Sequence, residues 1–276
     1  MTWITARDRT NIYVKDWGDT GGRPVVLVHG YPLTADSFDR TAMKLADAGY
    51  RAISYDRRGA GRSSQPWMGY DWDTYSDDLA DVMQATGVTQ DVTVIGYSMG
   101  GGEAARYMSR HGGKGVIKIG LYASIVPGML KSDDNPAGHT PSDYEEIVAG
   151  IEKDAAAFYR HTFQPPFYGV GMPHTASDDV IEASVNQALT YGMRAMTAMP
   201  HNFTFGDFTA DIPAINVPTL ILHGTQDKPA PIDATARRAH RMIPQSRLIE
   251  YVGHPHGFYA TNSDQMIADT LAFVKE

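Results

Sequence analysis

The chain has 276 residues, 42% of them hydrophobic, so it can bury a full core, and α/β folds of this length are often a single domain. Its 24 Lys and Arg against 32 Asp and Glu give a formal net charge of −8, without basic runs. This balance argues against nucleic acid or an anionic membrane as a partner. The absence of cysteine excludes disulfides and thiolate metal sites and fits a reducing compartment. No apolar leader opens the chain and no run approaches roughly 18 apolar residues, so we expect a cytoplasmic protein.

Strand-like and helix-like patterns alternate up to residue 124 and resume at about residue 217. This alternation predicts a mostly parallel sheet with helices on both faces. Between these parts, residues 125–216 show no clear strand. They hold two helix-like stretches, 142–163 and 177–199, and the proline and glycine of the separating segment 164–173 exclude one continuous helix. We therefore predict a core of residues 1–124 and 217–276 with a helical insertion at 125–216.

A serine lies on a glycine-bounded turn between an expected strand and an expected helix. The apolar strand at 91–95 runs into Gly96-Tyr97-Ser98-Met99-Gly100, and helix-like sequence follows. Glycines on both sides allow a sharp backbone and close strand–helix packing, so the Ser98 hydroxyl is held at the carboxyl end of the strand, as a nucleophile needs. The rival interpretation, a dinucleotide-binding loop, requires glycine at position 98 and a carboxylate about 20 residues later, and neither is present.

Serine needs a histidine base and an acid that orients it. Asp227 is the only carboxylate in the loop that follows the apolar strand beginning at Val217, and a later strand, 246–252, leads into Gly-His-Pro-His-Gly-Phe. The chain order Ser98, Asp227, His256 is the order used by one hydrolase fold. We favour His256 over His254 as the base, because flanking proline and glycine stiffen the loop around it. A metal pair formed by the two histidines is disfavoured, because no further ligand pattern accompanies them.

Attack by serine creates an oxyanion that needs backbone N–H donors. One donor normally follows the nucleophile and the other lies after the third strand, which indicates Met99 and Tyr31. We expect Gly30 to adopt an unusual backbone conformation and Pro32 to fix the next turn. We interpret His29 as a hydrogen-bonded structural histidine, because a triad needs only one.

Several longer segments resemble the α/β-hydrolase superfamily, and more narrowly the bacterial cofactor-free haloperoxidases, or perhydrolases, with their arylesterase and γ-lactamase relatives. The similarity covers nearly the whole chain. It implies an α/β-hydrolase fold with about eight strands and a helical cap, formed by residues 125–216, after the sixth strand. It also implies the same triad and oxyanion positions, with no cofactor and no metal. The segments are His29–Leu33, Tyr55–Trp67, Gly69–Leu79, Gly96–Tyr107, Ala123–Pro136 and Gly253–Phe258.

Substrate-pocket candidates are less sharply defined. Ile125 beside the sixth strand and Phe258 beside the base are chosen by position, and Pro32 by its place next to Tyr31. The Met- and Phe-rich insertion, including Phe158 and Met196, can line an apolar acyl pocket, but such a stripe is more often the packed underside of a helix. Three arginines, Arg57, Arg58 and Arg62, could mark an anion site, but on a glycine-rich loop we expect them to brace the turn.

The sequence thus favours a serine hydrolase that transfers acyl groups of small esters, lactones or lactams through an acyl-enzyme. The resemblance implies that hydrogen peroxide can replace water, giving a peracid from an ester or carboxylic acid. We also expect Pro32 to shift the Tyr31 carbonyl so that it accepts a hydrogen bond from peroxide. The alternative is a non-catalytic small-molecule-binding protein on a hydrolase scaffold. Whether the chain forms a homo-oligomer is left open.

Overall fold

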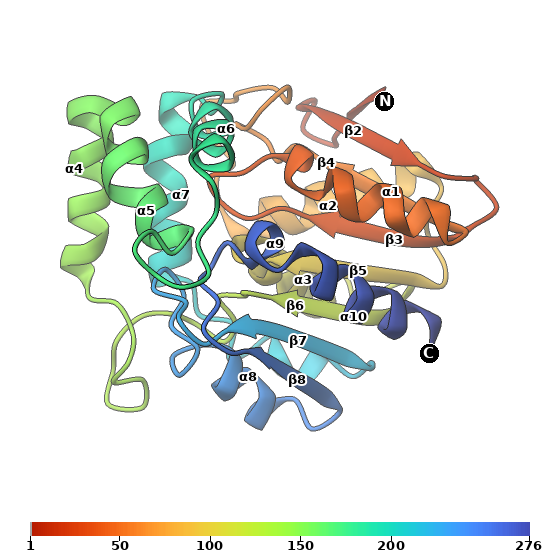
Figure 1. Ribbon diagram of the computed structural model, residues 1–276. Coiled ribbons are helices and arrows are strands. Elements are labelled where there is room, and N and C mark those ends of the chain that lie inside the picture. Colours follow the sequence, from red (N-terminus) through yellow and green to blue (C-terminus); the bar gives the residue numbers. More distant parts are fainter. Residues whose placement is uncertain (1) are drawn as a thin grey trace.

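The computed structural model describes residues 2–276 and is built around one eight-stranded sheet (Figure 1). The strand order is β1-β2-β4-β3-β5-β6-β7-β8, and only β2 runs antiparallel to its neighbours. The mostly parallel α/β sheet predicted from the alternating pattern is therefore confirmed. The strands are β1 (Thr2–Thr5), β2 (Asn11–Trp17), β3 (Arg23–Val28), β4 (Tyr50–Tyr55), β5 (Val92–Tyr97), β6 (Val116–Tyr122), β7 (Thr219–Gly224) and β8 (Ser246–Tyr251).

Helices cover both faces because the buried strands are apolar on both sides. Along β3, Val25 and Leu27 pack with the core cluster that includes α1 (Asp39–Asp47) and α10 (Ser263–Lys275). Val26 and Val28 pack with the cluster that includes α2 (Trp72–Thr86) and α3 (Met99–Arg110). This follows from the two-residue period of a strand. The helices of this part are η1 (Ala35–Phe38), α1 (Asp39–Asp47), α2 (Trp72–Thr86), α3 (Met99–Arg110), η3 (Ile212–Ala214), α8 (Ala236–Met242), α9 (Phe258–Thr261) and α10 (Ser263–Lys275).

The segment between β6 and β7 is helical and gathers at the end of the sheet toward which the parallel strands point (Figure 1). The expected break between two helical stretches is present, but it begins later than predicted, after Phe167. Residues 164–167 do not separate two helices, because helical structure continues through a π-helical turn into α5, where Pro165 and Pro166 occupy the first turn, in which proline is tolerated. The elements are α4 (Pro141–Phe158), η2 (Tyr159–Phe163), α5 (Gln164–Phe167), α6 (Asp178–Ala188) and α7 (Met193–Phe205).

The second expected helical stretch, 177–199, is likewise two helices. α6 ends at Ala188, and α7 begins after Gly192, whose N–H donates to the Gly59 carbonyl at 3.0 Å. α7 then continues through Pro200 to Phe205. Proline has no N–H, so the carbonyl of Met196 lacks its helical donor. This carbonyl takes part in the contact with Tyr31 described below.

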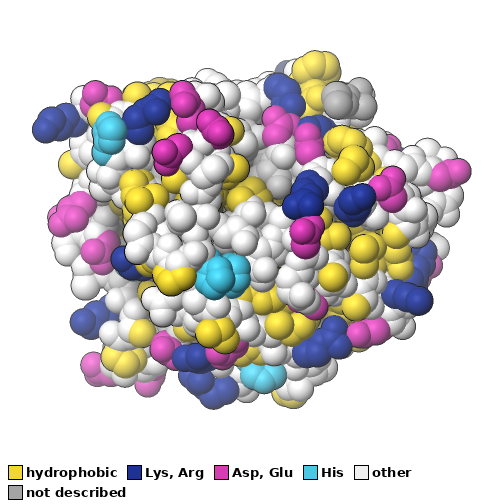
Figure 2. All heavy atoms as spheres, viewed as in Figure 1, with side chains coloured by type: hydrophobic (Ala, Val, Ile, Leu, Met, Phe, Trp, Pro, Cys, Tyr) yellow, Lys and Arg dark blue, Asp and Glu magenta, His cyan; other side chains and the backbone are white. Residues whose placement is uncertain are grey.

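Acidic and basic side chains are interspersed over the face seen in Figure 2, without a continuous basic patch. Most arginines are paired with carboxylates, for example Arg58 with Asp78 at 2.6 Å and Arg62 with Asp56 at 2.7 Å. No helix within residues 2–276 combines the length and apolar character needed to cross a bilayer.

Candidate active site

Ser98 lies on a strained turn between β5 and α3. Its φ is 53° and its ψ −117°, a conformation that costs a non-glycine residue about 1–3 kcal/mol. Backbone hydrogen bonds hold the turn, from Ser98 N–H to the Tyr122 carbonyl at 2.8 Å and from Gly101 N–H to the Ser98 carbonyl at 2.9 Å. The side chain is almost buried and lines a cavity. The turn therefore presents the hydroxyl at the carboxyl end of β5.

The glycines around Ser98 are required by close packing. A Cβ on Gly96 would lie 2.3 Å from the Gly100 carbonyl oxygen, and a Cβ on Gly100 would lie 2.1 Å from the Val28 carbonyl oxygen. Neither distance is tolerated by real side chains. The pentapeptide pattern in the sequence thus reflects the fit of α3 against β5 and β3.

Asp227 and His256 meet behind this cavity. Asp227 follows β7 and His256 follows β8, and these strands are parallel neighbours, so their carboxyl-end loops lie side by side. His256 Nδ1 is 2.6 Å from Asp227 Oδ2, while Asp227 Oδ1 accepts from the Ala230 N–H at 2.7 Å. His256 lines the same cavity as Ser98. The ring of Phe167 stands edge-on to the imidazole at 4.6 Å between centroids.

The environment of Asp227 favours its carboxylate form. Burial alone would raise its pKa, but the neighbouring imidazoles of His256 and His223 hold the pKa below its ordinary value. An ionised carboxylate at this position keeps the Nδ1 proton of His256 in place, which leaves Nε2 free to act as a base. The second contact, with His223, was not anticipated from the sequence.

His254 lies apart from Asp227. Its ring stacks on that of His174 with centroids 4.0 Å apart, and its Nδ1 is 3.3 Å from Thr261 Oγ1. Burial and the neighbouring His174 lower the pKa of His254. Of the two histidines in the His-Pro-His segment, the structure brings only His256 to the carboxylate.

The expected oxyanion donors flank Ser98. Met99 is the first residue of α3, and Tyr31 follows β3 in a turn closed by a 3.0 Å bond from Leu33 N–H to the Gly30 carbonyl. Within residues 2–276 neither the Tyr31 nor the Met99 N–H has a protein acceptor. Two backbone donors are thus free near the serine.

Gly30 does not adopt the unusual backbone expected for it, since its φ is not positive. Space explains the glycine instead, because a Cβ there would lie 2.8 Å from Ser98 Cβ and 3.1 Å from the Tyr97 carbonyl oxygen. His29 is a structural residue, as predicted. Its Nε2 accepts from Arg57 N–H at 2.9 Å, so the proton is on Nδ1, which donates to the Gly30 carbonyl at 2.8 Å. Burial and the charge of Arg57 lower the pKa of His29 well below its usual value.

Buried ion pairs brace the loops beneath the serine. Arg57 Nε donates to Glu103 Oε2 at 2.7 Å, with both side chains fully buried, and Arg57 Nη2 donates to the His29 carbonyl at 2.8 Å. The Tyr55 hydroxyl also donates to Glu103. These contacts join the loop after β4 to α3 and to the segment that follows β3, just before Tyr31. The expectation that these arginines brace a turn therefore agrees with their contacts.

The side chain of Tyr31 connects its loop to the helical insertion. Its hydroxyl donates to the Met196 carbonyl at 3.1 Å and is hydrogen bonded to the Tyr159 hydroxyl. The Met196 carbonyl is the one left without a helical donor by Pro200. Phe163 and Phe203 pack around the Tyr31 ring, with centroids within 5.9 Å. Tyr31 thus lines the cavity, and its side chain is anchored to the helical insertion.

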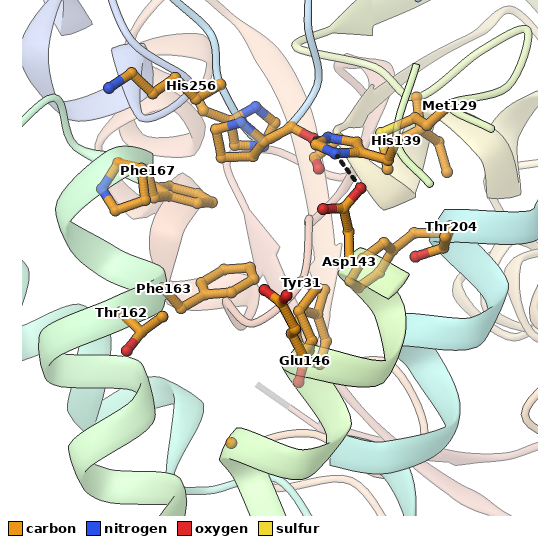
Figure 3. A pocket seen from close by; sticks show the side chains of 18 of the residues that line it. Tyr31, Met129, His139, Asp143, Glu146, Thr162, Phe163, Phe167, Thr204 and His256 are labelled. Carbon is orange, nitrogen blue, oxygen red and sulfur yellow. Dashed lines mark hydrogen bonds and ion pairs between the residues drawn. The ribbon is translucent and has the colours of Figure 1, made fainter. Parts of the chain in front are cut away.

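The cavity has a volume of about 420 Å³, within the range of small-molecule sites. Figure 3 shows Phe163 and Phe167 pointing into it, with His139 and Asp143 on the opposite side. Most of the wall is apolar, and a few charged side chains join it. The lining residues are Tyr31, Ser98, Ile125, Met129, His139, Asp143, Glu146, Ile147, Gly150, Phe158, Thr162, Phe163, Pro166, Phe167, Phe203, Thr204, Lys228, Pro229 and His256.

Of the five pocket candidates, Ile125 and Phe158 line the cavity, and three expectations are wrong. Phe258 is fully buried under the sheet, with its ring 5.3 Å from that of Tyr97. Met196 is not part of the lining but packs in a buried cluster with Tyr31 and residues of the insertion, and its carbonyl accepts from the Tyr31 hydroxyl. Pro32 is buried and is not part of the lining.

The sequence interpretation missed the charged lining residues. Asp143, Glu146 and Gly150 repeat at helical spacing on one face of α4, and this face borders the cavity. The Asp143 carboxylate already accepts a hydrogen bond from the Thr140 N–H at 2.6 Å, so it is only partly available to a ligand. Lys228, next to Asp227, joins the lining from the other side. The spacing was visible in the sequence, but which helix face turns toward the sheet was not.

Comparison with known proteins agrees with this geometry. A family profile described as alpha/beta hydrolase fold matches residues 23–168. Among curated proteins, a non-heme haloperoxidase of Rhodococcus erythropolis is 38% identical over 276 residues, covering 100% of both chains. A bifunctional esterase/perhydrolase of Acinetobacter calcoaceticus is 34% identical with the same coverage. The crystal structure of a bromoperoxidase from Bacillus anthracis superposes with a TM-score of 0.93 at 34% identity, again covering 100% of both chains.

The chain therefore belongs to the α/β-hydrolase family. Within that family it is an enzyme close to non-heme haloperoxidases and esterase/perhydrolases, as the sequence motifs indicated. The fold expected from the resemblance, a mostly parallel sheet of eight strands with helices on both faces, is confirmed.

Proposed function

We propose that this protein is a serine hydrolase that transfers acyl groups of small esters, lactones or lactams through an acyl-enzyme, and that hydrogen peroxide can replace water in the second step. The observation that carries the proposal is the common cavity. It is lined by Ser98 on its strained turn and by His256, whose Nδ1 is bonded to Asp227. A nucleophile, a base and an orienting acid on three loops are the parts that acyl transfer needs.

The proposed steps use His256 in turn as base and as acid. His256 Nε2 takes the Ser98 proton as the hydroxyl oxygen attacks the acyl carbon, and the N–H groups of Tyr31 and Met99 hold the oxyanion. His256 then gives the proton to the leaving alcohol or amine. In the second half, His256 removes a proton from water or hydrogen peroxide as its oxygen attacks the acyl carbon. The bond between the acyl carbon and Ser98 Oγ then breaks, His256 returns the proton to Ser98 Oγ, and an acid or a peracid is released.

We further propose that residues 125–216 form a cap that closes this site. Phe158, Phe163 and Phe167 from this segment line the cavity next to His256, and an apolar roof limits the water that reaches the acyl-enzyme. The mostly apolar wall supports a compact apolar acyl group as substrate, with the charged side chains at Glu146 and Lys228 exposed at the edge.

The test is the time course of a chromogenic ester. We expect wild-type protein to release about one equivalent of alcohol per site in a burst, followed by slower turnover, as acyl-enzyme accumulation requires. Ser98→Ala should retain the fold by circular dichroism and lose the burst and several orders of magnitude in turnover. Ser109→Ala, which removes a partly buried hydroxyl on α3 bonded to Asp211, serves as the matched control. Retention of a tenth of the activity in Ser98→Ala would contradict the proposal, and a non-catalytic binding protein would show no turnover at all.

A further inference from the structure

A second histidine contacts the candidate acid. His223 is the penultimate residue of β7, four residues before Asp227, and both side chains are fully buried. Its Nε2 is 3.0 Å from Asp227 Oδ2, the oxygen that also accepts from His256. The same Nε2 is 2.8 Å from the carbonyl oxygen of Ala230. The steps proposed above give this residue no role.

The surroundings of the ring determine where its proton is. Nε2 faces a carboxylate oxygen and a carbonyl oxygen, and both are acceptors, so this nitrogen must carry hydrogen. Nδ1 is buried without a hydrogen-bond partner among the described residues, so a second proton there would be an unsatisfied buried donor. The ring is therefore a neutral imidazole in the Nε2–H form.

The contact with His223 adds to the interactions that hold the Asp227 carboxylate. The His223 N–H donates to the Ala230 carbonyl, and the Ala230 N–H donates to Asp227 Oδ1, so the ring is linked to the carboxylate through the loop 227–230. With Oδ1 held by Ala230 and Oδ2 in contact with His223 Nε2 at 3.0 Å, the carboxylate plane cannot rotate away from His256 without losing these contacts.

We infer that His223 is a positioning residue of the candidate triad: through its hydrogen bond to the Ala230 carbonyl and its 3.0 Å contact with Oδ2, it keeps Asp227 in the rotamer and charge state in which the carboxylate orients His256. The inference rests on the proposed function, because it assigns a role within that site. His223 does not reach the cavity and touches no substrate. It acts through Asp227 and through Ala230, which holds that carboxylate.

The other titratable groups around this pair come from three elements. Glu250 of β8 stands opposite His223 in the strand register and is paired with Arg237 at 2.7 Å, outside the buried site. Tyr97 of β5 donates its hydroxyl to the His256 carbonyl, and burial raises its pKa well above the usual value. Lys228 is exposed. The acid limb of the activity profile therefore reports the Asp227–His256 pair.

The direction of the pH effect follows from the donor. The His223 N–H, 3.0 Å from Oδ2, stabilises the ionised carboxylate and lowers the pKa of Asp227, and so lowers the proton affinity of the coupled pair. Removing the donor raises that affinity, so the protonated, inactive form persists to higher pH. The acid limb of kcat/KM should then move upward, whereas a residue that only fills space would leave it in place.

The experiment compares ester hydrolysis by wild type, His223→Leu and His223→Gln over the range of about pH 5 to pH 9. In His223→Leu we expect kcat/KM to fall by roughly 10- to 100-fold, mostly through kcat, and the acid limb to rise by about one pH unit. In His223→Gln, which restores an N–H without a titratable ring, the limb should return toward wild type. His254→Leu is the control and should leave the acid limb unmoved.

An acid limb of His223→Leu that superimposes on that of wild type would overturn the inference. If His223→Leu does not fold, nitrogen-15 NMR of the wild-type protein decides the question, because it assigns the histidine tautomer directly. We expect the Nε2–H tautomer for His223, and an Nδ1–H ring would overturn the inference. The NMR result does not depend on activity. Full activity in Ser98→Ala would contradict the proposed function, but it would not change the tautomer expected for His223.

Discussion

Ser98, Asp227 and His256 are each held by contacts outside their own group. The backbone of Ser98 is bonded to β6, Asp227 is held by Ala230 and His223, and the carbonyl of His256 accepts from Tyr97. Such support restricts the rotamers of reacting groups before substrate arrives. Substitution of a supporting residue should therefore lower turnover more than substrate affinity.

The two C-terminal histidines should behave differently. We predict that His256→Ala is nearly as damaging as Ser98→Ala, with a loss of several orders of magnitude in kcat, because the proposed triad has one base. His254→Ala should change turnover only modestly, since its ring stacks on His174 away from Asp227. Steady-state ester hydrolysis by the two variants measures this. The reverse pattern would show that His254, and not His256, is the base.

Pro32 offers a test of the peroxide step. We predict that Pro32→Leu lowers the ratio of peracid formation to ester hydrolysis, because proline restricts Tyr31, whose carbonyl is proposed to accept from the extra O–H of hydrogen peroxide. A hydrogen bond present in only one transition state is worth about 1 kcal/mol, or several-fold in the ratio. Both reactions are measured on the same preparation of each variant. An unchanged ratio would limit Pro32 to a role in the turn, where it is buried outside the cavity lining.

Among the elements, α7 has a direct connection with the loop after β3. Pro200 leaves the Met196 carbonyl without its helical donor, and the Tyr31 hydroxyl donates to this carbonyl. Tyr159, at the start of the π-helical turn, binds the same hydroxyl. The helical insertion therefore anchors the side chain of a residue whose backbone N–H is a candidate oxyanion donor. A change in the position of α7 would be transmitted to the site through Tyr31.

Removing this anchor should lower the rate. We predict that Tyr31→Phe, which keeps the ring but loses both hydroxyl contacts, reduces kcat by roughly 3- to 10-fold, as expected for about 1 kcal/mol of lost positioning. The control is Tyr70→Phe, which removes a hydroxyl bonded to Pro66 away from the serine turn. Equal kcat values for Tyr31→Phe and wild type would show that the backbone of Tyr31 does not depend on the insertion.

The sequence predicted elements better than it predicted contacts between them. The strand, turn and helix around Ser98 were predictable because glycine at 96 and 100 is a local requirement of their packing. The loops of Asp227 and His256 were predictable because each follows an apolar strand, and parallel neighbours bring such loops together. The roles assigned to these residues stay predictions, for which the experiments above are designed.

The errors lie where one segment packs on another. Phe258 is close to His256 in the sequence, but its ring is buried in the core cluster against the sheet and not in the cavity. Met196 is buried in the packing within the insertion. The contact of His223 with Asp227 could not be predicted, because His223 lies within the apolar strand that precedes the acid and nothing in the sequence pattern shows that its ring lies against Asp227. Side-chain direction at such places depends on tertiary packing rather than on local period.

At the scale of the whole molecule, the sheet places the reactive loops and the insertion covers them. Both Ser98 and His256 lie at the carboxyl ends of parallel strands, which is where ligands bind in open α/β sheets. The helices α4–α7 stand over the same end (Figure 1). The cavity is thus bounded by the core below and by the aromatic side chains of the insertion above.

The central claim is that Ser98 carries the acyl group during turnover. The most direct measurement is mass spectrometry of the protein quenched in acid during turnover of an activated ester, followed by peptide mapping. The account predicts one added acyl group per chain, on the peptide that contains Ser98, and its disappearance in Ser98→Ala and on addition of hydrogen peroxide with release of peracid. Turnover with no adduct on Ser98, or an adduct that persists in Ser98→Ala at the same rate, would contradict it.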